Sequence, residues 1–159
     1  METLITSPEI ERYIQNLYPI EDPLLIEMGE LGSKINFPLV GPLVGRLLYQ
    51  FSKLISAKKV FEMGSGFGYS AFWFALALPE NGIMHLTDQS QKNSDLAKHY
   101  FLQGNLSHKA KFHVGDAGQV PGPALFPDQP ERADAVFDDD RQRRVFRSRC
   151  RRGALHRLG

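Results

Sequence analysis

The chain has 159 residues, which is enough for one domain with a sizeable core and too few for two ordinary domains. The hydrophobic share of 42% and the charged share of 23% are typical of a globular protein and exclude a largely disordered chain. The net charge is +1, but eight arginines and no acidic residue fall within residues 141–159, so the preceding residues are net acidic. The single cysteine, Cys150, excludes an internal disulfide framework and favours a cytoplasmic location.

Neither a leader nor a membrane segment is expected. Residues 1–15 do not show a basic stretch followed by an apolar one, which is the pattern of a secretory signal. The apolar run at residues 70–79 is shorter than the roughly 20 residues that a membrane-spanning helix needs.

The first 57 residues read as a helical lead-in with three helices. Ser7, Pro8 and Glu9 provide an N-cap, a first-turn proline and an acidic first turn, which predict a helix up to about Leu17. The second helix is expected over residues 23–33, and the third over residues 42–56, where apolar residues recur at helical spacing.

The pattern then changes to strands that alternate with helices. We expect strands at residues 58–64, 82–88, 110–116 and 133–138, and helices at residues 70–78 and 90–104. The second of these helices should stop at Gly104, and Phe72 and Trp73 of the first should pack against the sheet. Such an alternation predicts an α/β fold with a parallel sheet.

A glycine-rich turn follows the first expected strand, with glycines at positions 64, 66 and 68. Such a cluster indicates either a tight strand–helix junction or a backbone that a ligand approaches closely. A dinucleotide fingerprint would read G-x-G-x-x-G, which is not the spacing found here. Glu62, two residues before the turn, would repel a pyrophosphate, whereas it suits a ligand with an ammonium or sulfonium charge. An NAD-dependent oxidoreductase is therefore disfavoured.

The pattern acid-x-G-x-G-x-G after a strand resembles the first motif of S-adenosylmethionine-dependent methyltransferases. In that family an acid at the end of the second strand binds the ribose hydroxyls, and Asp88 stands there, 20 residues beyond Gly68. Asp116, followed by Ala117, closes the third strand, where the family places an acid near the adenine. The plainer alternatives are that Asp88 caps the next helix, with Ser90 or Asn93 competing for that role, and that Asp116 only ends a strand.

The stretch 57–88 is similar to the small cation-dependent O-methyltransferases of the caffeoyl-CoA and catechol type, through "GYSA" at 68–71 and "PENG" at 79–82. This resemblance implies a Rossmann-like methyltransferase core that transfers a methyl group from S-adenosylmethionine to a hydroxyl of a small, catechol-like acceptor. It also implies lead-in helices at a homodimer contact, with a lid or simple packing as the alternatives for residues 13–28. The implied cofactor contacts are Val40, Glu62, Gly64, Ser65, Gly66, Ser70, Asp88, Asp116 and Ala117.

The same resemblance implies a divalent cation such as magnesium, which binds the acceptor oxygens. Asp138, Asp139 and Asp140 lie near the family's first ligand position, and Asp139 has the best register. The Asp-Asn pair that the family carries after a fifth strand has no counterpart, so a solvated loop is the alternative. The histidines show no metal-binding spacing and are expected on strands or at the surface.

We divide the chain into the lead-in (1–57), an incomplete cofactor-binding core (58–140) and a divergent basic tail (141–159) that we expect to be disordered. The later strands of the core are expected to be missing, through truncation or a reading-frame shift, or because the tail is a native arm. A coding sequence for residues 140–150, written with permitted codons and read one base later, can encode a different peptide. That peptide is similar to the sequence that follows the first metal-binding aspartate in the family. Two alternative functions are a non-catalytic cofactor-binding fragment and a basic-tailed nucleic-acid binder.

Overall fold

The computed structural model describes residues 7–120. The expected fourth strand, the Asp138–Asp140 triplet and the arginine-rich tail all lie outside these residues. Within the described range, no helix is long and apolar enough to cross a membrane. The elements in chain order are α1 (Pro8–Leu17), α2 (Pro23–Lys34), α3 (Gly41–Leu54), β1 (Lys59–Met63), α4 (Tyr69–Ala77), β2 (Ile83–Asp88), α5 (Gln91–Gln103), η1 (Ser107–Lys109), β3 (Ala110–Val114) and η2 (Ala117–Gln119).

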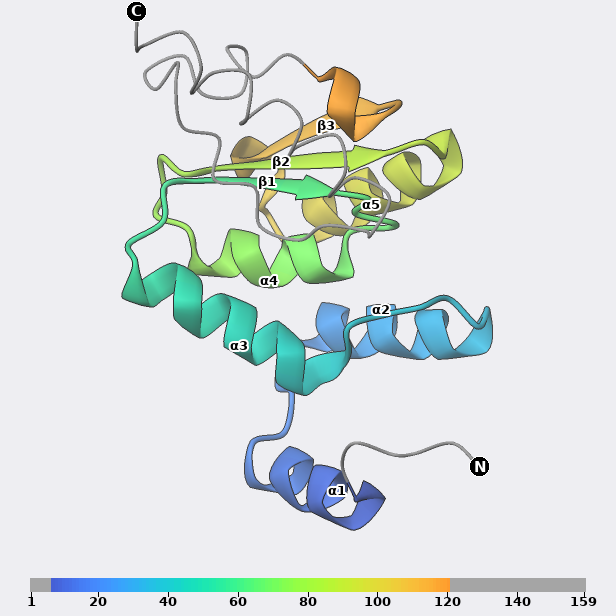
Figure 1. The fold of residues 1–159 in the computed structure, drawn as a ribbon, viewed down its shortest axis with the longest axis vertical. Coiled ribbons are helices and arrows are strands. Elements are labelled where there is room, and N and C mark those ends of the chain that lie inside the picture. The colour runs from blue at the N-terminus through green and yellow to red at the C-terminus, as the bar shows by residue number, and fades with distance from the viewer. Residues whose placement is uncertain (1–6, 121–159) are drawn as a thin grey trace, which may run out of the picture.

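The three described strands form a parallel sheet in the order β1-β2-β3. The pairs Val60–Met84 and Leu86–Phe112 set the register and place these apolar side chains on one face. Figure 1 shows α4 and α5 against that face, with α3 and α2 beyond α4 and α1 farthest from the sheet. The expected α/β fold with parallel strands and N-terminal helices is confirmed.

Side-chain caps explain where several helices begin. The Ser7 hydroxyl accepts a hydrogen bond from the Glu9 amide, and a proline follows as the first residue of α1. The Asp22 carboxylate accepts from the amides of Leu24 and Leu25 and starts α2 in the same way. Ser90 caps α5 through the Asn93 amide, so it takes the capping position for which Asp88 was the alternative.

Helix α4 is apolar almost all round because it is buried on two sides, between the sheet and α3. Phe72 packs edge-on against Phe101 of α5, as expected for a core residue beneath the sheet. Trp73 is buried too, and its indole lies against Gly45 of α3, where a Cβ atom would meet the indole nitrogen at 2.2 Å. Trp73 is thus a core residue, as expected, and its contact with α3 is one that the apolar sequence of α4 did not reveal.

Helix α5 ends at Gln103 with Gly104 as its C-cap residue, which confirms the expected stop at Gly104. Gly104 is the C-cap residue with an ordinary φ of −81°, and Asn105 takes the left-handed conformation with φ of +55°. Position 104 needs a glycine because the Phe72 ring packs against it: a Cβ atom there would lie 2.6 Å from that ring. The helix stops where the sequence predicts, but the left-handed residue after it is Asn105 and not Gly104.

Candidate cofactor site

The glycine turn joins β1 to α4 at the carboxyl edge of the sheet. Its three glycines all have positive φ, at +81° for Gly64, +53° for Gly66 and +89° for Gly68, which side-chain-bearing residues rarely adopt. The amides of Gly64 and Ser65 donate to the Thr87 carbonyl at 3.0 and 2.7 Å, which ties the turn to β2. The sequence therefore places glycines where this backbone path needs them.

Space around the three glycines differs and separates structural roles from ligand roles. A Cβ atom on Gly66 would lie 2.7 Å from the Phe37 ring, and one on Gly68 would lie 3.1 Å from Ala97. A Cβ atom on Gly64 would meet nothing within 4 Å. The protein fills the space beside Gly66 and Gly68, whereas the backbone of Gly64 faces open space that a ligand can approach.

Glu62, at the end of β1, is 7% exposed and points toward this turn. One carboxylate oxygen, Oε1, accepts a hydrogen bond from the Ser70 hydroxyl at 2.5 Å. The other, Oε2, is buried and accepts no hydrogen bond from any described residue. Burial raises the pKa of Glu62 to about 7, although the hydroxyls of Ser70 and Ser65 oppose this rise. A buried acceptor without a partner is costly, and a cationic or N–H-bearing ligand would satisfy it.

Asp88 ends β2 and already holds several protein donors. Its Oδ2 accepts from the Gly66 amide at 2.9 Å, and its Oδ1 accepts from the Ser90 amide at 2.8 Å and the Asn93 side chain at 3.1 Å. A carboxylate offers about four acceptor positions, so three are engaged here. The remaining capacity fits one further donor, whereas two ribose hydrogen bonds would require Asp88 to release a protein donor.

Two hollows lie at this edge and share Met63 and Gly64. The first, which we call the Glu62 hollow, has a volume of about 190 Å³ and is lined by Phe37, Pro38, Leu39, Val40, Leu48, Glu62, Met63, Gly64, Ser65, Gly66, Tyr69 and Ser70. The second, the Asp88 hollow, has a volume of about 320 Å³ and is lined by Met63, Gly64, Thr87, Asp88, Gln89, Gly115, Asp116 and Ala117. Together they form a path along the strand ends from Glu62 to Ala117.

The third strand contributes the far end of this path. The Asp116 carboxylate accepts a hydrogen bond from the Gly118 amide at 2.8 Å and caps the short helix η2. Asp116 is exposed, whereas Ala117 is half-buried, and both line the Asp88 hollow. Gly115 has φ of +142° and no atom within 4 Å of its Cβ position, so the backbone leaves room for a ligand here as well.

The structure brings the sequence-predicted residues to one edge of the sheet, but it gives some of them other contacts. Ser65 is buried, and its hydroxyl accepts from the Thr87 amide at 3.0 Å, so it fastens the turn. Val40 precedes α3 and is 44% exposed beside the Glu62 hollow. Sequence reasoning missed Phe37, Thr87 and Gly115; only Gly115, a glycine directly after a strand, carried a signal that could have been found.

Among residues 7–120 no group of three or more histidine, cysteine, aspartate or glutamate side chains could hold a metal ion. His85 and His113 do stack, with Nδ1 of one 3.0 Å from Nε2 of the other, and burial lowers the pKa of both rings, that of His85 to about 4. A pair is too few for a metal site of this kind. The metal prediction at Asp139 lies outside the described residues.

Comparison with known proteins decides the family. The sequence model of the O-methyltransferase family matches residues 23–147, which is most of the chain. The chain belongs to the O-methyltransferase family. Among curated relatives of the chain, caffeoyl-CoA O-methyltransferase 1 of Zea mays is 32% identical over 120 residues, covering 73% of this chain and 46% of the maize protein. Catechol O-methyltransferase of Niastella koreensis is 27% identical over 132 residues, covering 82% and 59% of the two chains. The chain thus spans about half the length of the curated relatives that it matches.

Solved structures agree with the fold of the chain. A methyltransferase from Geobacter sulfurreducens has a TM-score of 0.68 and 27% identity, covering 72% of this chain and 60% of that one. An O-methyltransferase from Bacillus cereus, solved with S-adenosylhomocysteine, has a TM-score of 0.70 and 21% identity, covering 88% and 65%. The second likeness shows the fold alone. Both place the described residues in a Rossmann-like methyltransferase architecture.

Proposed function

We propose that this chain binds S-adenosylmethionine along the strand ends and belongs to an enzyme that methylates a hydroxyl of a small, catechol-like acceptor. The observation that carries the proposal is Glu62, a buried carboxylate whose Oε2 has no protein partner and which faces a hollow beside an unobstructed Gly64. An ammonium or sulfonium group is the kind of partner that such a carboxylate favours. The names of the curated relatives support O-methylation.

The residues present fit this cofactor. In our proposal Glu62 and Ser70 hold the cationic end, Gly64 lets the backbone approach the ligand, and Asp88 accepts one ribose hydroxyl. Ala117 and Gly115 line the space left for the adenine. When bound, the cofactor supplies an electrophilic methyl group on a sulfonium. The chain's residues contribute orientation, which is the main requirement when the leaving group is already good.

A divalent cation such as magnesium and the acceptor complete the proposal. Asp139 remains the proposed ligand on this chain. A cation beside the acceptor would lower the pKa of its hydroxyl and so favour the nucleophilic oxyanion. We also keep as proposals the cytoplasmic location, based on the single cysteine, and the division of the chain at residues 57 and 140.

Thermal unfolding with and without S-adenosylhomocysteine tests the cofactor proposal. Ligand at about 100 times its dissociation constant should stabilise the fold by roughly 2.7 kcal/mol, a rise of several degrees in Tm.

Methyl transfer to catechol is then measured with magnesium and with a chelator. We expect the chelator to abolish transfer and to leave the Tm rise unchanged. A cooperative transition with no Tm rise would contradict the proposal and favour the nucleic-acid-binding alternative; a Tm rise without transfer would favour the non-catalytic fragment.

We further propose a homodimer through the lead-in helices. Large apolar side chains on α1 and α3 are exposed, which is unusual for a monomer: Ile10, Tyr13, Leu17, Leu47, Phe51 and Leu54. α1 and α3 contact each other, so the two helices that carry these side chains are neighbours in the fold. Sedimentation velocity should give the mass of a dimer. Phe51→Glu should give a folded monomer whose Tm, unlike that of the unsubstituted chain, does not rise with protein concentration. A monomeric unsubstituted chain would contradict this.

A further inference from the structure

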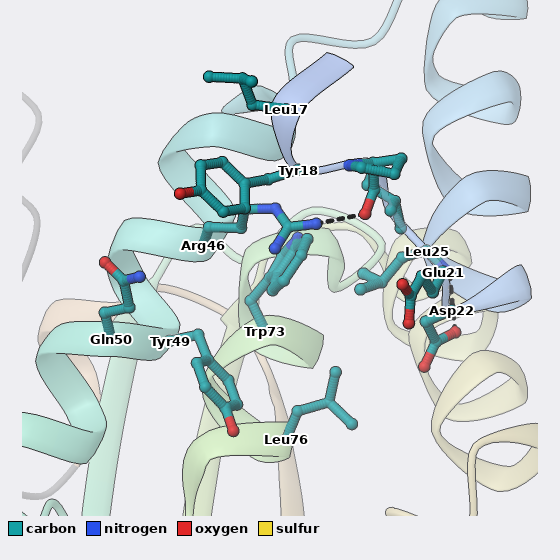
Figure 2. Close-up of a pocket in the computed structure, with 12 residues that line it drawn as sticks. Leu17, Tyr18, Glu21, Asp22, Leu25, Arg46, Tyr49, Gln50, Trp73 and Leu76 are labelled. Atoms are coloured by element: carbon teal, nitrogen blue, oxygen red, sulfur yellow. Dashed lines mark hydrogen bonds between the residues drawn. The ribbon is translucent and has the colours of Figure 1, made fainter. Parts of the chain in front are cut away.

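A third hollow lies away from the strand ends, between the α1–α2 connection, α3 and α4. Its volume is about 440 Å³, larger than either hollow at the strand ends and within the usual range for small-molecule sites. Figure 2 shows it, and we call it the Arg46 hollow. Its lining residues, none of which lines the Glu62 or Asp88 hollow, include Tyr18, Glu21, Arg46, Tyr49, Trp73 and Leu76.

The walls of the Arg46 hollow suit an aromatic ring. Tyr18, Tyr49 and Trp73 present three aromatic side chains to it, and leucines from three helices close the remainder. Trp73 is only 7% exposed and is held in place by its contact with Gly45. Rings packed edge-on or offset against such walls gain more than their buried area alone provides.

Arg46 supplies the charge. One terminal nitrogen, Nη2, donates to the Pro19 carbonyl at 2.5 Å, and the guanidinium carbon lies 6.0 Å from the centre of the Tyr18 ring. The inner nitrogen, Nε, is buried and donates no hydrogen bond within the described part of the chain. Over the same residues, no carboxylate forms an ion pair with Arg46. A partly buried cation with a spare donor and no counter-ion favours an anionic ligand.

The two acidic residues at the hollow do not take this role. The Asp22 carboxylate accepts from the amides of Leu24 and Leu25 and is committed to the start of α2. Glu21 is exposed to solvent, where water screens its repulsion of a bound anion. Figure 2 shows both acids across the hollow from Tyr18 and Arg46.

We propose that the Arg46 hollow binds a small aromatic carboxylate, with the carboxylate on Arg46 Nε and the ring among Tyr18, Tyr49 and Trp73. This site is distinct from the proposed cofactor site, because α3 turns Leu48 toward the Glu62 hollow and Arg46 and Tyr49 toward this one. Binding at the Arg46 hollow does not depend on methyl transfer. Its ligand would bind as an effector or second ligand on the helical side of the molecule.

Trp73 is the only tryptophan in the chain, so its fluorescence reports directly on this hollow. We would titrate the full chain with phenylacetate and, as a neutral match of the same shape, phenylacetamide. The expected result is a saturable fluorescence change for phenylacetate, with a dissociation constant in the millimolar range or tighter, and at least a tenfold weaker response to phenylacetamide. Equal responses to both probes, or no saturable response, would overturn the proposal.

Arg46→Gln should weaken phenylacetate binding by about tenfold or more, because it removes the charge-assisted hydrogen bond. Arg12→Gln is the matched control, since Arg12 is an exposed arginine of α1 that does not line the hollow, and binding should be unchanged. Undiminished binding by a folded Arg46→Gln would overturn the proposal. Should Arg46→Gln fail to fold, the comparison of acid and amide on the unsubstituted chain decides the question alone.

Discussion

Gly64→Ala should lose cofactor binding in a chain that still folds. The new Cβ atom would meet no protein atom within 4 Å, so the fold bears only the strain of a positive φ, about 1 kcal/mol. The same Cβ atom would stand where the Glu62 and Asp88 hollows meet, in the space proposed for the ligand. We expect affinity for S-adenosylhomocysteine to fall by about tenfold to a hundredfold, measured by calorimetric titration.

Gly66→Ala is the matched control in the same turn. It also has positive φ, but its Cβ atom would lie 2.7 Å from the Phe37 ring, which must move. We expect it to reduce the free energy of unfolding by about 2–4 kcal/mol, clearly more than Gly64→Ala. Equal destabilisation by the two variants, or unaltered affinity in Gly64→Ala, would contradict the assignment of Gly64 to the ligand and Gly66 to the fold.

Cofactor affinity should depend on pH through Glu62. Because burial raises the pKa of Glu62 to about 7, this side chain carries its full charge only above that pH. A cationic ligand binds the ionised form, so we expect affinity to rise by up to tenfold per pH unit from about pH 5 and to level off above about pH 7. Glu62→Gln should flatten this profile and lower affinity at pH 8 by about tenfold or more.

S-adenosylhomocysteine lacks the sulfonium charge of S-adenosylmethionine but keeps its ammonium group. Comparing the two ligands therefore shows which of these charges interacts with Glu62. A pH profile shared by S-adenosylmethionine and S-adenosylhomocysteine would assign Glu62 to the ammonium, and a profile seen with S-adenosylmethionine alone would assign it to the sulfonium. Flat profiles for both ligands in the unsubstituted chain would contradict the role of Glu62.

The same raised pKa has a consequence for stability without ligand. The folded chain holds the Glu62 proton to higher pH than the unfolded chain, whose glutamate titrates near 4.5. The contribution of Glu62 to folding is therefore fully present below about pH 4.5 and is lost as pH rises through about pH 7. Glu62→Gln should remove this decline, which denaturant unfolding at several pH values would show.

The order of the described helices and strands could be predicted because each carries a local signal. Ser7 and Asp22 cap helices that start with proline, and the glycine turn marks the junction of β1 and α4. Glu62 and Asp88 could be predicted as site residues for a similar reason, because each is an acidic residue at the end of a strand that the sequence already indicates. These are features of a few neighbouring residues, which a single sequence displays directly.

What could not be predicted depends on which segments meet in space. The apolar sequence of α4 did not show that Trp73 faces α3, and nothing near Gly66 in the sequence indicated that Phe37 would fill its side. The donors that occupy Asp88 come from the turn and from α5, so its limited capacity for ribose emerged only in the fold. The Arg46 hollow combines three segments and carried no motif at all.

Thr87 has a consequence for how the site comes into being. Its carbonyl accepts from Gly64 and Ser65, its amide donates to the Ser65 hydroxyl, and its own hydroxyl donates to the Glu62 carbonyl at 2.7 Å. A residue from the second strand thus determines the path of a turn that follows the first. Because these bonds tie the glycine turn to the second strand, we expect the ligand site and the strand pairing to form in the same folding event, and local opening of one to weaken the other.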